Sequence, residues 1–130
     1  MLSSMKLIII IPGIFIIFGL LILAAYLYAT DSSYRISASE AKKRIQKGEF
    51  DLILDVRTPL ERSTLGVYPG SVPISASELE AKMPRLYPNQ QLRILAYCNT
   101  GHRARMATDK LHALGYSNTV YISSTYQSLL

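Results

Sequence analysis

Cys98 is the residue of this sequence best suited to covalent chemistry, and it is the one cysteine among 130 residues. An apolar segment ends at Tyr97, and a helical pattern begins near His102. A thiol between a strand and a helix N-terminus faces successive backbone N–H groups and the positive end of the helix dipole. These features favour the thiolate, the nucleophilic form of cysteine, whereas a free thiol is mostly protonated at neutral pH. By position alone, an inert buried thiol is an equally good interpretation.

The loop after Cys98 contains the other candidate site residues. Its sequence is CNTGHRA, and the residues expected to bind substrate are Asn99, Thr100, Gly101 and His102. Gly101 permits a tight turn that wraps closely around a small anion, and Arg103 places a positive charge near the thiol. His102 and His112 also fit ordinary surface histidines, an interpretation that is favoured because neither has a partner recognisable from the sequence.

The composition narrows the possible functions. The 14 basic and 9 acidic residues give a formal charge of +5. The basic residues are scattered along the chain, so no nucleic-acid partner is expected. A single cysteine excludes an intramolecular disulfide framework and a multi-cysteine zinc site. We predict neither a metal nor a cofactor.

The chain has room for one domain of ordinary size plus an accessory segment. Capping-box patterns at Ser37 and Ser75 predict two helix starts, and the second helix is expected to be interrupted at Pro84. Apolar runs of strand length alternate with the helical patterns, which is typical of parallel strands covered on both faces. The predicted helices lie at 37–47, from 75 to about 83 and at 102–114, and the predicted strands at 50–56, 92–97 and 119–122. The fold class is therefore α/β with a mainly parallel sheet.

Four segments, in the same order along the chain, resemble rhodanese-like sulfurtransferases. The loop CNTGHRA resembles the family's active loop, Cys-x-x-Gly-x-Arg followed by a small residue. The other three segments are DVRTPLE at 55–61, GVYPGSVPI at 66–74 and LHALGYSNTVYI at 111–122. The resemblance implies a three-layer rhodanese-like sandwich over residues 36–130.

The resemblance also implies a reaction. Cys98 would attack the outer sulfur of a donor such as thiosulfate and become a persulfide. It would then pass the sulfur to an acceptor such as cyanide, a small thiol or a protein. Arg103 would brace the loop and add positive potential.

Loop length bears on the substrate. From Cys98 to Arg103 there are six residues, as in sulfur-transferring members, whereas related dual-specificity phosphatases and arsenate reductases have a loop one residue longer. The smaller loop favours sulfur over phosphate. The main alternative to an enzyme is a non-catalytic module for binding or sulfur sensing, and phosphatase or arsenate reductase chemistry is a further one.

Charged residues near the first predicted strand are expected to be structural. Asp55 and Arg57 are predicted to support the site, because a carboxylate at a strand end beside an arginine is more often a pair that orders loops than a catalytic pair. Glu61 and Arg62 are predicted to be solvated surface residues, and the tyrosines of the domain are expected to pack.

Two stretches depart from the family's pattern. Val67 and Tyr68 replace the usual His-Ile, and Ser71 replaces a small alanine, so the approach to the next helix is expected to differ in shape. After the last strand the chain has ISSTYQSLL, where the family continues with a Gly-Gly turn, a tryptophan and a closing helix. We therefore predict a domain shortened at its C-terminus. Its final residues would cap the core, its stability would be lower, or a partner would cover the sheet.

Residues 7–28 form an apolar run of 22 residues without a charge. As a helix this run would span about 33 Å, enough to cross a bilayer core. Residues 1–28 are therefore predicted to be a membrane anchor, followed by a linker at 29–35. A cleaved signal peptide is the main alternative, but its apolar core is usually only about 7 to 15 residues long, and the residues after Ala25 make a poor cleavage site.

The side of the membrane is predicted from the flanking charges. Lys6 precedes the span and Asp31 follows it, which favours an exported domain. A wider window favours the opposite side, because it includes Lys42, Lys43, Arg44 and Lys47. These residues belong to a predicted helix of the folded domain, where charges have less influence, so we predict an extracytoplasmic domain.

Overall fold

Four parallel strands form the central sheet of the computed structural model, which describes residues 3–130. The strands are β1 (Leu52–Asp55), β2 (Val72–Pro73), β3 (Ile94–Tyr97) and β4 (Thr119–Tyr121), and they lie in the order β2-β1-β3-β4. β1 pairs with β3 in a register that places Leu54 opposite Ala96. Arg35 extends the β4 edge through an isolated parallel bridge to Tyr121. The prediction of an α/β fold with a parallel sheet is confirmed.

The two faces of the sheet are both buried, as the apolar composition of its strands predicts. In β3 all four residues are buried, and their side chains alternate between the faces. Ile94 and Ala96 belong to one core cluster, whereas Leu95 and Tyr97 belong to the other. Each fully buried leucine or isoleucine contributes about 1.5–3 kcal/mol to the stability of the fold.

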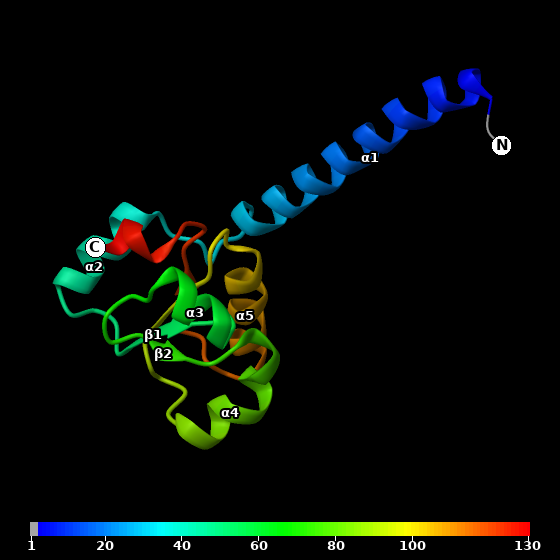
Figure 1. Ribbon diagram of the computed structural model, residues 1–130. Coiled ribbons are helices and arrows are strands. Elements are labelled where there is room, and N and C mark those ends of the chain that lie inside the picture. Colours follow the sequence, from blue (N-terminus) through cyan, green and yellow to red (C-terminus); the bar gives the residue numbers. More distant parts are fainter. Residues whose placement is uncertain (1–2) are drawn as a thin grey trace.

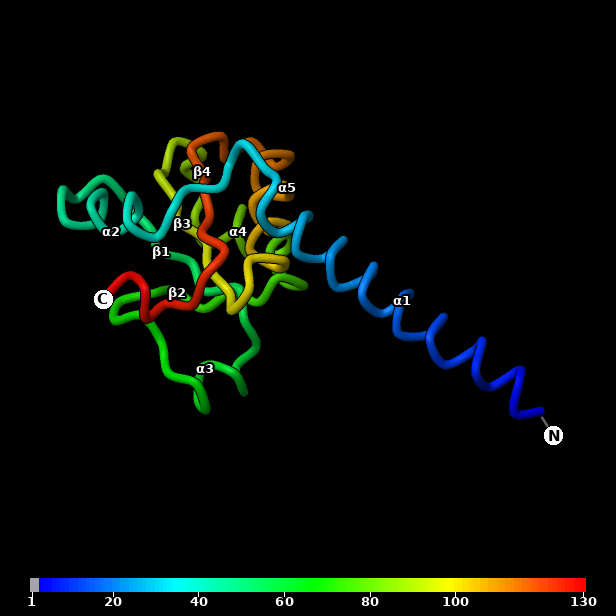
Figure 2. The backbone as a smooth tube through the Cα atoms, turned by 90° about the horizontal axis from the view of Figure 1, so that it is seen from above, coloured from blue at the N-terminus to red at the C-terminus, as the bar shows by residue number. Residues whose placement is uncertain are grey.

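Helices cover the two faces and produce three layers (Figures 1 and 2). On one face lie α4 (Leu79–Leu86) and α5 (His102–Ala113), which contribute Met83 and Leu111 to the larger core cluster. On the other face lie α2 (Ala38–Gln46) and the short 3-10 helix η2 (Tyr126–Leu129). Leu129 is 3% exposed in the smaller core cluster. The final residues therefore cap this face, which the sequence left open as one of three outcomes.

Two predicted capping signals have different outcomes. The Ser37 hydroxyl accepts a hydrogen bond from the Glu40 amide at 3.0 Å and begins α2 as predicted. At Ser75 the prediction is wrong, because a 3-10 turn, η1 (Ala76–Glu78), follows without a side-chain cap. The Ser75 hydroxyl instead donates to the Arg57 carbonyl oxygen at 3.3 Å. The predicted interruption at Pro84 is also wrong, since α4 continues to Leu86. Pro84 lies in the last turn, where few backbone hydrogen bonds remain to be lost.

A helix that the sequence analysis missed, α3 (Pro59–Leu65), follows β1. Thr58 caps its N-terminus, and the Glu61 side chain returns a hydrogen bond to the Thr58 amide. This is a capping box with proline in the first turn. No residue of α3 is buried, so the apolar periodicity that reveals longer helices is absent from it.

The N-terminal helix α1 (Ser4–Thr30) extends away from the sheet (Figure 1). Its 27 residues are long and apolar enough to cross a membrane, and its most apolar window has a mean hydropathy of 3.1. The helix continues two residues into the segment 29–35 that the sequence assigned to a linker. Ala29 is 3% exposed, so the end of α1 packs against the sheet domain.

Candidate active site

Cys98 lies directly after β3 and four residues before α5, at the carboxyl edge of the sheet. Its side chain is almost fully buried, with 1% of its surface exposed. The Gly101 amide donates a hydrogen bond to the Cys98 Sγ at 3.1 Å. The strand-to-loop-to-helix position predicted for the thiol is therefore the observed one, and the loop folds back so that an amide faces the sulfur.

Gly101 makes this loop geometry possible. Its φ angle is +98°, in the left-handed region that side chains rarely adopt. A Cβ atom at this position would also lie 2.6 Å from the Ser123 Cα atom. Glycine is thus required here both by the turn and by the close approach of the segment after β4.

Arg103 is held by Glu61 of α3. Its two terminal nitrogens, Nη1 and Nη2, donate to the Glu61 Oε1 and Oε2 atoms at 2.6 and 2.7 Å. The Asn99 amide nitrogen donates to the Glu61 Oε2 atom at 2.8 Å. A single carboxylate therefore joins both ends of the loop that contains Cys98.

The charges of this pair stabilise each other. Hydrogen bonds from Arg103 first, together with those from Thr58, lower the pKa of Glu61 to about 2. The same Glu61 hydrogen bonds raise the pKa of Arg103. The prediction that Glu61 is a solvated surface residue is wrong, because its side chain is only 24% exposed and holds the loop that contains Cys98. The Thr-Pro-Leu-Glu sequence at 58–61, a capping box, could have revealed the start of α3, but not the contact between Glu61 and Arg103.

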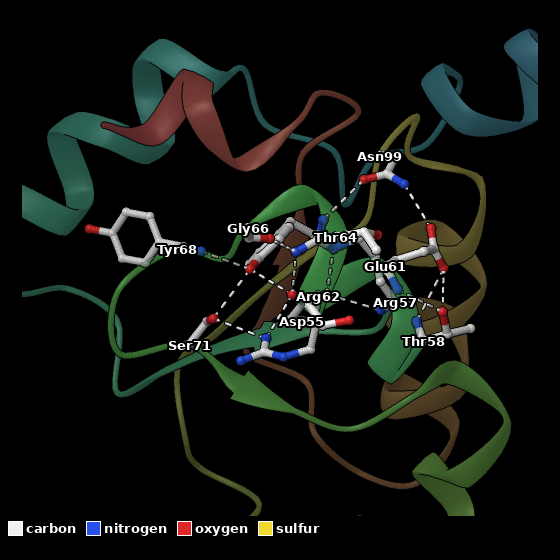
Figure 3. A network of polar contacts seen from close by, with 12 residues as sticks. Asp55, Arg57, Thr58, Glu61, Arg62, Thr64, Gly66, Tyr68, Ser71 and Asn99 are labelled. Atoms are coloured by element: carbon white, nitrogen blue, oxygen red, sulfur yellow. Dashed lines mark hydrogen bonds and ion pairs between the residues drawn. The ribbon is translucent and has the colours of Figure 1, made fainter.

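Asp55 and Arg57 form a buried ion pair behind the loop (Figure 3). The Asp55 side chain is fully buried, and Arg57 is 2% exposed. The Arg57 Nη2 atom lies 2.7 Å from the Asp55 Oδ2 atom, and Arg57 Nε lies 3.0 Å from Asp55 Oδ1. Burial by itself raises the pKa of Asp55, but the hydrogen bonds from Arg57 and Tyr97 outweigh burial and lower it.

Arg57 connects this pair to the loop that contains Cys98. Its Nη1 atom donates to the Asn99 Oδ1 atom at 3.4 Å, and its Nη2 atom donates to the Gly66 carbonyl oxygen at 2.7 Å. Because Asn99 also bonds to Glu61, a continuous polar chain runs from Asp55 at the end of β1 through Arg57 and Asn99 to Glu61 (Figure 3). From Glu61 the chain continues to Arg103 at the start of α5. Asp55 and Arg57 are therefore bonded, through Asn99, to the loop that contains Cys98.

Two further side chains complete the bonds of Asp55. The Arg62 Nη1 atom and the Tyr97 hydroxyl each donate to Asp55 Oδ2 at 2.7 Å. The prediction that Arg62 is a solvated surface residue is wrong. Its side chain is 17% exposed and is the second cation, after Arg57, that balances the buried Asp55. Tyr97, which was expected to pack, also has this polar role. Ser71 bonds to both donors, at 3.2 Å in each case, so the replacement of the family's alanine adds contacts within the network.

The remaining loop residues face the end of α1. Thr100 and His102 are exposed, and the His102 ring lies 4.8 Å from the Tyr28 ring. His112 has two partners, neither of which can be recognised from the sequence. Its ring stacks on Tyr34 at 3.8 Å, and its Nε2 atom lies 2.8 Å from the Thr119 carbonyl oxygen. Within residues 3–130 there is no group of three or more metal-binding His, Cys, Asp or Glu side chains.

Comparison with known proteins agrees with this architecture. The description "Rhodanese-like domain" belongs to a family profile that matches residues 37–125. The chain therefore belongs to the rhodanese-like family. No curated protein matches the chain.

Several solved structures share the fold. A human single-domain sulfurtransferase has 26% identity and a TM-score of 0.61, with 75% of this chain and 95% of the human chain covered. A rhodanese-related protein from Thermoplasma volcanium has 29% identity and a TM-score of 0.61, with coverage of 73% and 88%. A Rhodopseudomonas palustris protein of unknown function, called a possible tyrosine phosphatase, has 23% identity and a TM-score of 0.68, with coverage of 83% and 87%. At that identity it indicates the fold alone.

Proposed function

We propose that the protein is a sulfurtransferase that carries sulfur as a persulfide on Cys98. The observation that supports this most directly is the Gly101 amide, which donates to Sγ at 3.1 Å in a six-residue loop at a helix N-terminus. Such a donor stabilises negative charge on the Cys98 sulfur, both in the attacking thiolate and in the thiolate that is released when the persulfide gives up its outer sulfur. Family membership points in the same direction.

The reaction takes two steps. In the first, the Cys98 thiolate attacks the outer sulfur of thiosulfate, an S–S bond forms at Cys98, and sulfite leaves with the electron pair of the broken S–S bond. In the second, cyanide or a thiolate attacks the outer sulfur of the persulfide, and the Cys98 thiolate is released. Both steps conserve charge and need no external oxidant. Because Cys98 is only 1% exposed, small donors are favoured.

In this mechanism the charged side chains position the loop. Arg103 contributes positive potential, and its bidentate pair with Glu61 keeps the first turn of α5 in place. Asn99, held between Arg57 and Glu61, fixes the other end of the loop. Thr100, Gly101 and His102 form the part of the loop that a donor anion would meet.

The test uses the full chain in detergent. Incubation with thiosulfate should add the mass of one sulfur atom to Cys98, and addition of cyanide should remove this mass and release thiocyanate. The Cys98→Ser variant should do neither. An unmodified wild-type protein would instead support a module for binding or sulfur sensing, an alternative that the near-complete burial of Cys98 favours. Hydrolysis of an aryl phosphate, lost in Cys98→Ser, would support phosphatase chemistry.

We also propose that α1 anchors the protein in a membrane with the domain on the extracytoplasmic side. The apolar surface of α1 is exposed along its length, and its C-terminal end is bonded to the domain rather than joined by a free tether. A retained helix is favoured over a cleaved signal peptide because the apolar run is longer than the core of a signal peptide and the residues after Ala25 make a poor cleavage site. Resistance to carbonate extraction and an active periplasmic phosphatase fused after Leu130 are expected. A fluorescent cytoplasmic fusion would contradict the orientation.

A further inference from the structure

The C-terminal end of α1 is bonded to α5, the helix that follows the loop of Cys98. Arg105, in the first turn of α5, donates from its Nη1 atom to the carbonyl oxygens of Tyr28 and Asp31 at 2.6 and 3.1 Å. Its guanidinium carbon lies 4.1 Å from the centre of the Tyr28 ring. The Tyr121 hydroxyl donates to the Ala29 carbonyl oxygen at 2.7 Å. These bonds satisfy backbone carbonyls that a helix C-terminus leaves without partners.

The same contacts leave no slack between the helix and the loop. Ala29 is 3% exposed, and a Cβ atom built on Gly101 would lie 3.6 Å from the Ala29 Cβ atom. The loop that contains Cys98 is thus held against the last turn of α1. If α1 lies in a bilayer, the distance of the loop from that bilayer is set by the helix.

Helix geometry gives that distance. A hydrocarbon core of roughly 30 Å takes about 20 helical residues at 1.5 Å each. Counted from Leu7, the first residue of the apolar run, the core ends at about Tyr26. Ala29 lies roughly 4.5 Å further along the helix axis. The active loop therefore lies within one helical turn of the hydrocarbon, at the level of the lipid headgroups.

A cavity of about 290 Å³ lies at this junction. Its volume is close to the lower end of the range of small-molecule sites, about 300–1,000 Å³. The apolar wall comes from one side of α1, and the polar end comes from the loop that contains Cys98. The lining residues are Ile22, Ala25, Tyr26, Ala29, Thr100 and His102.

We propose that the sulfur acceptor is an amphiphilic thiol from the membrane, with its alkyl chain in this cavity and its thiolate at the loop. The proposal rests on the proposed function, and on α1 as a membrane helix. Thiosulfate can meet the polar end of this cavity at Thr100 and His102, but a doubly charged anion loses hydration against the apolar wall, which is therefore free for an alkyl chain. An alkyl thiol has no such cost along its chain. Its thiolate attacks the outer sulfur of the Cys98 persulfide, an alkyl persulfide forms, and the Cys98 thiolate leaves with the electrons of the broken S–S bond.

The experiment uses the full chain in phosphatidylcholine vesicles, and thiosulfate is first used to convert Cys98 to its persulfide. The acceptors are decanethiol and water-soluble 2-mercaptoethanol, and mass spectrometry measures the alkyl persulfide formed. Partition into the vesicles favours decanethiol for any membrane-bound enzyme, so the ratio of the two kcat/KM values is compared between variants. In Ala25→Trp, which fills the cavity, this ratio should fall roughly tenfold, the effect of about two lost buried CH₂ groups. In the matched control Leu21→Trp, on a part of α1 outside the cavity, the ratio should not change.

Each outcome has a separate meaning. An equal ratio in the wild type and Ala25→Trp would overturn the acceptor proposal, and so would a ratio that falls equally in Leu21→Trp. The wild type alone can also overturn the proposal, if its kcat/KM for decanethiol is no higher than for ethanethiol at equal concentrations in the vesicle. A lipid chain would then be the occupant of the cavity. If Cys98 never gains a sulfur from thiosulfate, the proposed function itself fails.

Discussion

The pair between Glu61 and Arg103 should determine how firmly the active loop is held. Glu61→Gln keeps the shape of the side chain but removes the charge that accepts two hydrogen bonds from Arg103 and one from Asn99. Bonds to charged groups contribute about 1.5–3 kcal/mol when they are sheltered, and exposed ion pairs about 0–1 kcal/mol. The side chains of Arg103 and Glu61 are 34% and 24% exposed. A loss of about 1–2 kcal/mol in the free energy of unfolding is therefore expected.

The measurement is urea unfolding of the full chain in detergent, followed by circular dichroism, together with the rate of persulfide formation at Cys98. The control is Glu78→Gln, which removes an exposed pair with Lys82 four residues further along the chain. Such pairs contribute about 0.3–0.5 kcal/mol. The reasoning is refuted if the two variants lose equal stability, or if Glu61→Gln forms the persulfide as fast as the wild type.

The pH dependence of this difference has a definite sign. The pKa of Glu61 in the folded protein is lowered from 4.5 to about 2. A carboxyl group whose pKa is lowered by folding stabilises the fold at pH values above its pKa in the unfolded chain. This contribution is lost as the pH falls through its pKa in the folded protein. The stability difference between the wild type and Glu61→Gln should thus be complete above about pH 4.5 and shrink as the pH approaches 2.

Three further variants test other contacts of the site. Gly101→Ala should prevent persulfide formation and lower the free energy of unfolding by about 2 kcal/mol or more. The control Gly48→Ala, whose Cβ would meet open space, should lower it by only about 1 kcal/mol. Equal losses in urea unfolding would contradict the close approach of Gly101 to Ser123. Asp55→Asn leaves the buried Arg57 without its counter-charge and should lower the free energy of unfolding by about 3–5 kcal/mol, so a loss below about 1 kcal/mol would show that Arg57 finds another partner. Arg105→Ala should speed amide hydrogen exchange in the last turn of α1, measured by mass spectrometry, and unchanged exchange there would show that the bonds of Arg105 do not hold the helix end.

Local patterns determined the elements of this fold that the sequence predicts well. The apolar run before Cys98, the cap at Ser37 and the helical periodicity after His102 act over a few residues, so each can be recognised without knowledge of the rest of the chain. They are sufficient for the α/β class and for the position of the thiol between a strand and a helix. The uncharged run at 7–28 similarly predicts a long apolar helix, because its length and composition are properties of the segment alone.

Tertiary structure alone decided which residues hold the site together. Glu61 and Arg103 are 42 positions apart. They meet because α3 follows β1 and α5 follows β3, and β1 and β3 are neighbours in the sheet. A solvated surface residue and the partner of a loop arginine have the same local sequence, so pattern reasoning could not separate them. The contact between Arg105 and Tyr28 is of the same kind. It depends on where the end of α1 meets α5, and that contact places the loop of Cys98 at the end of the apolar helix.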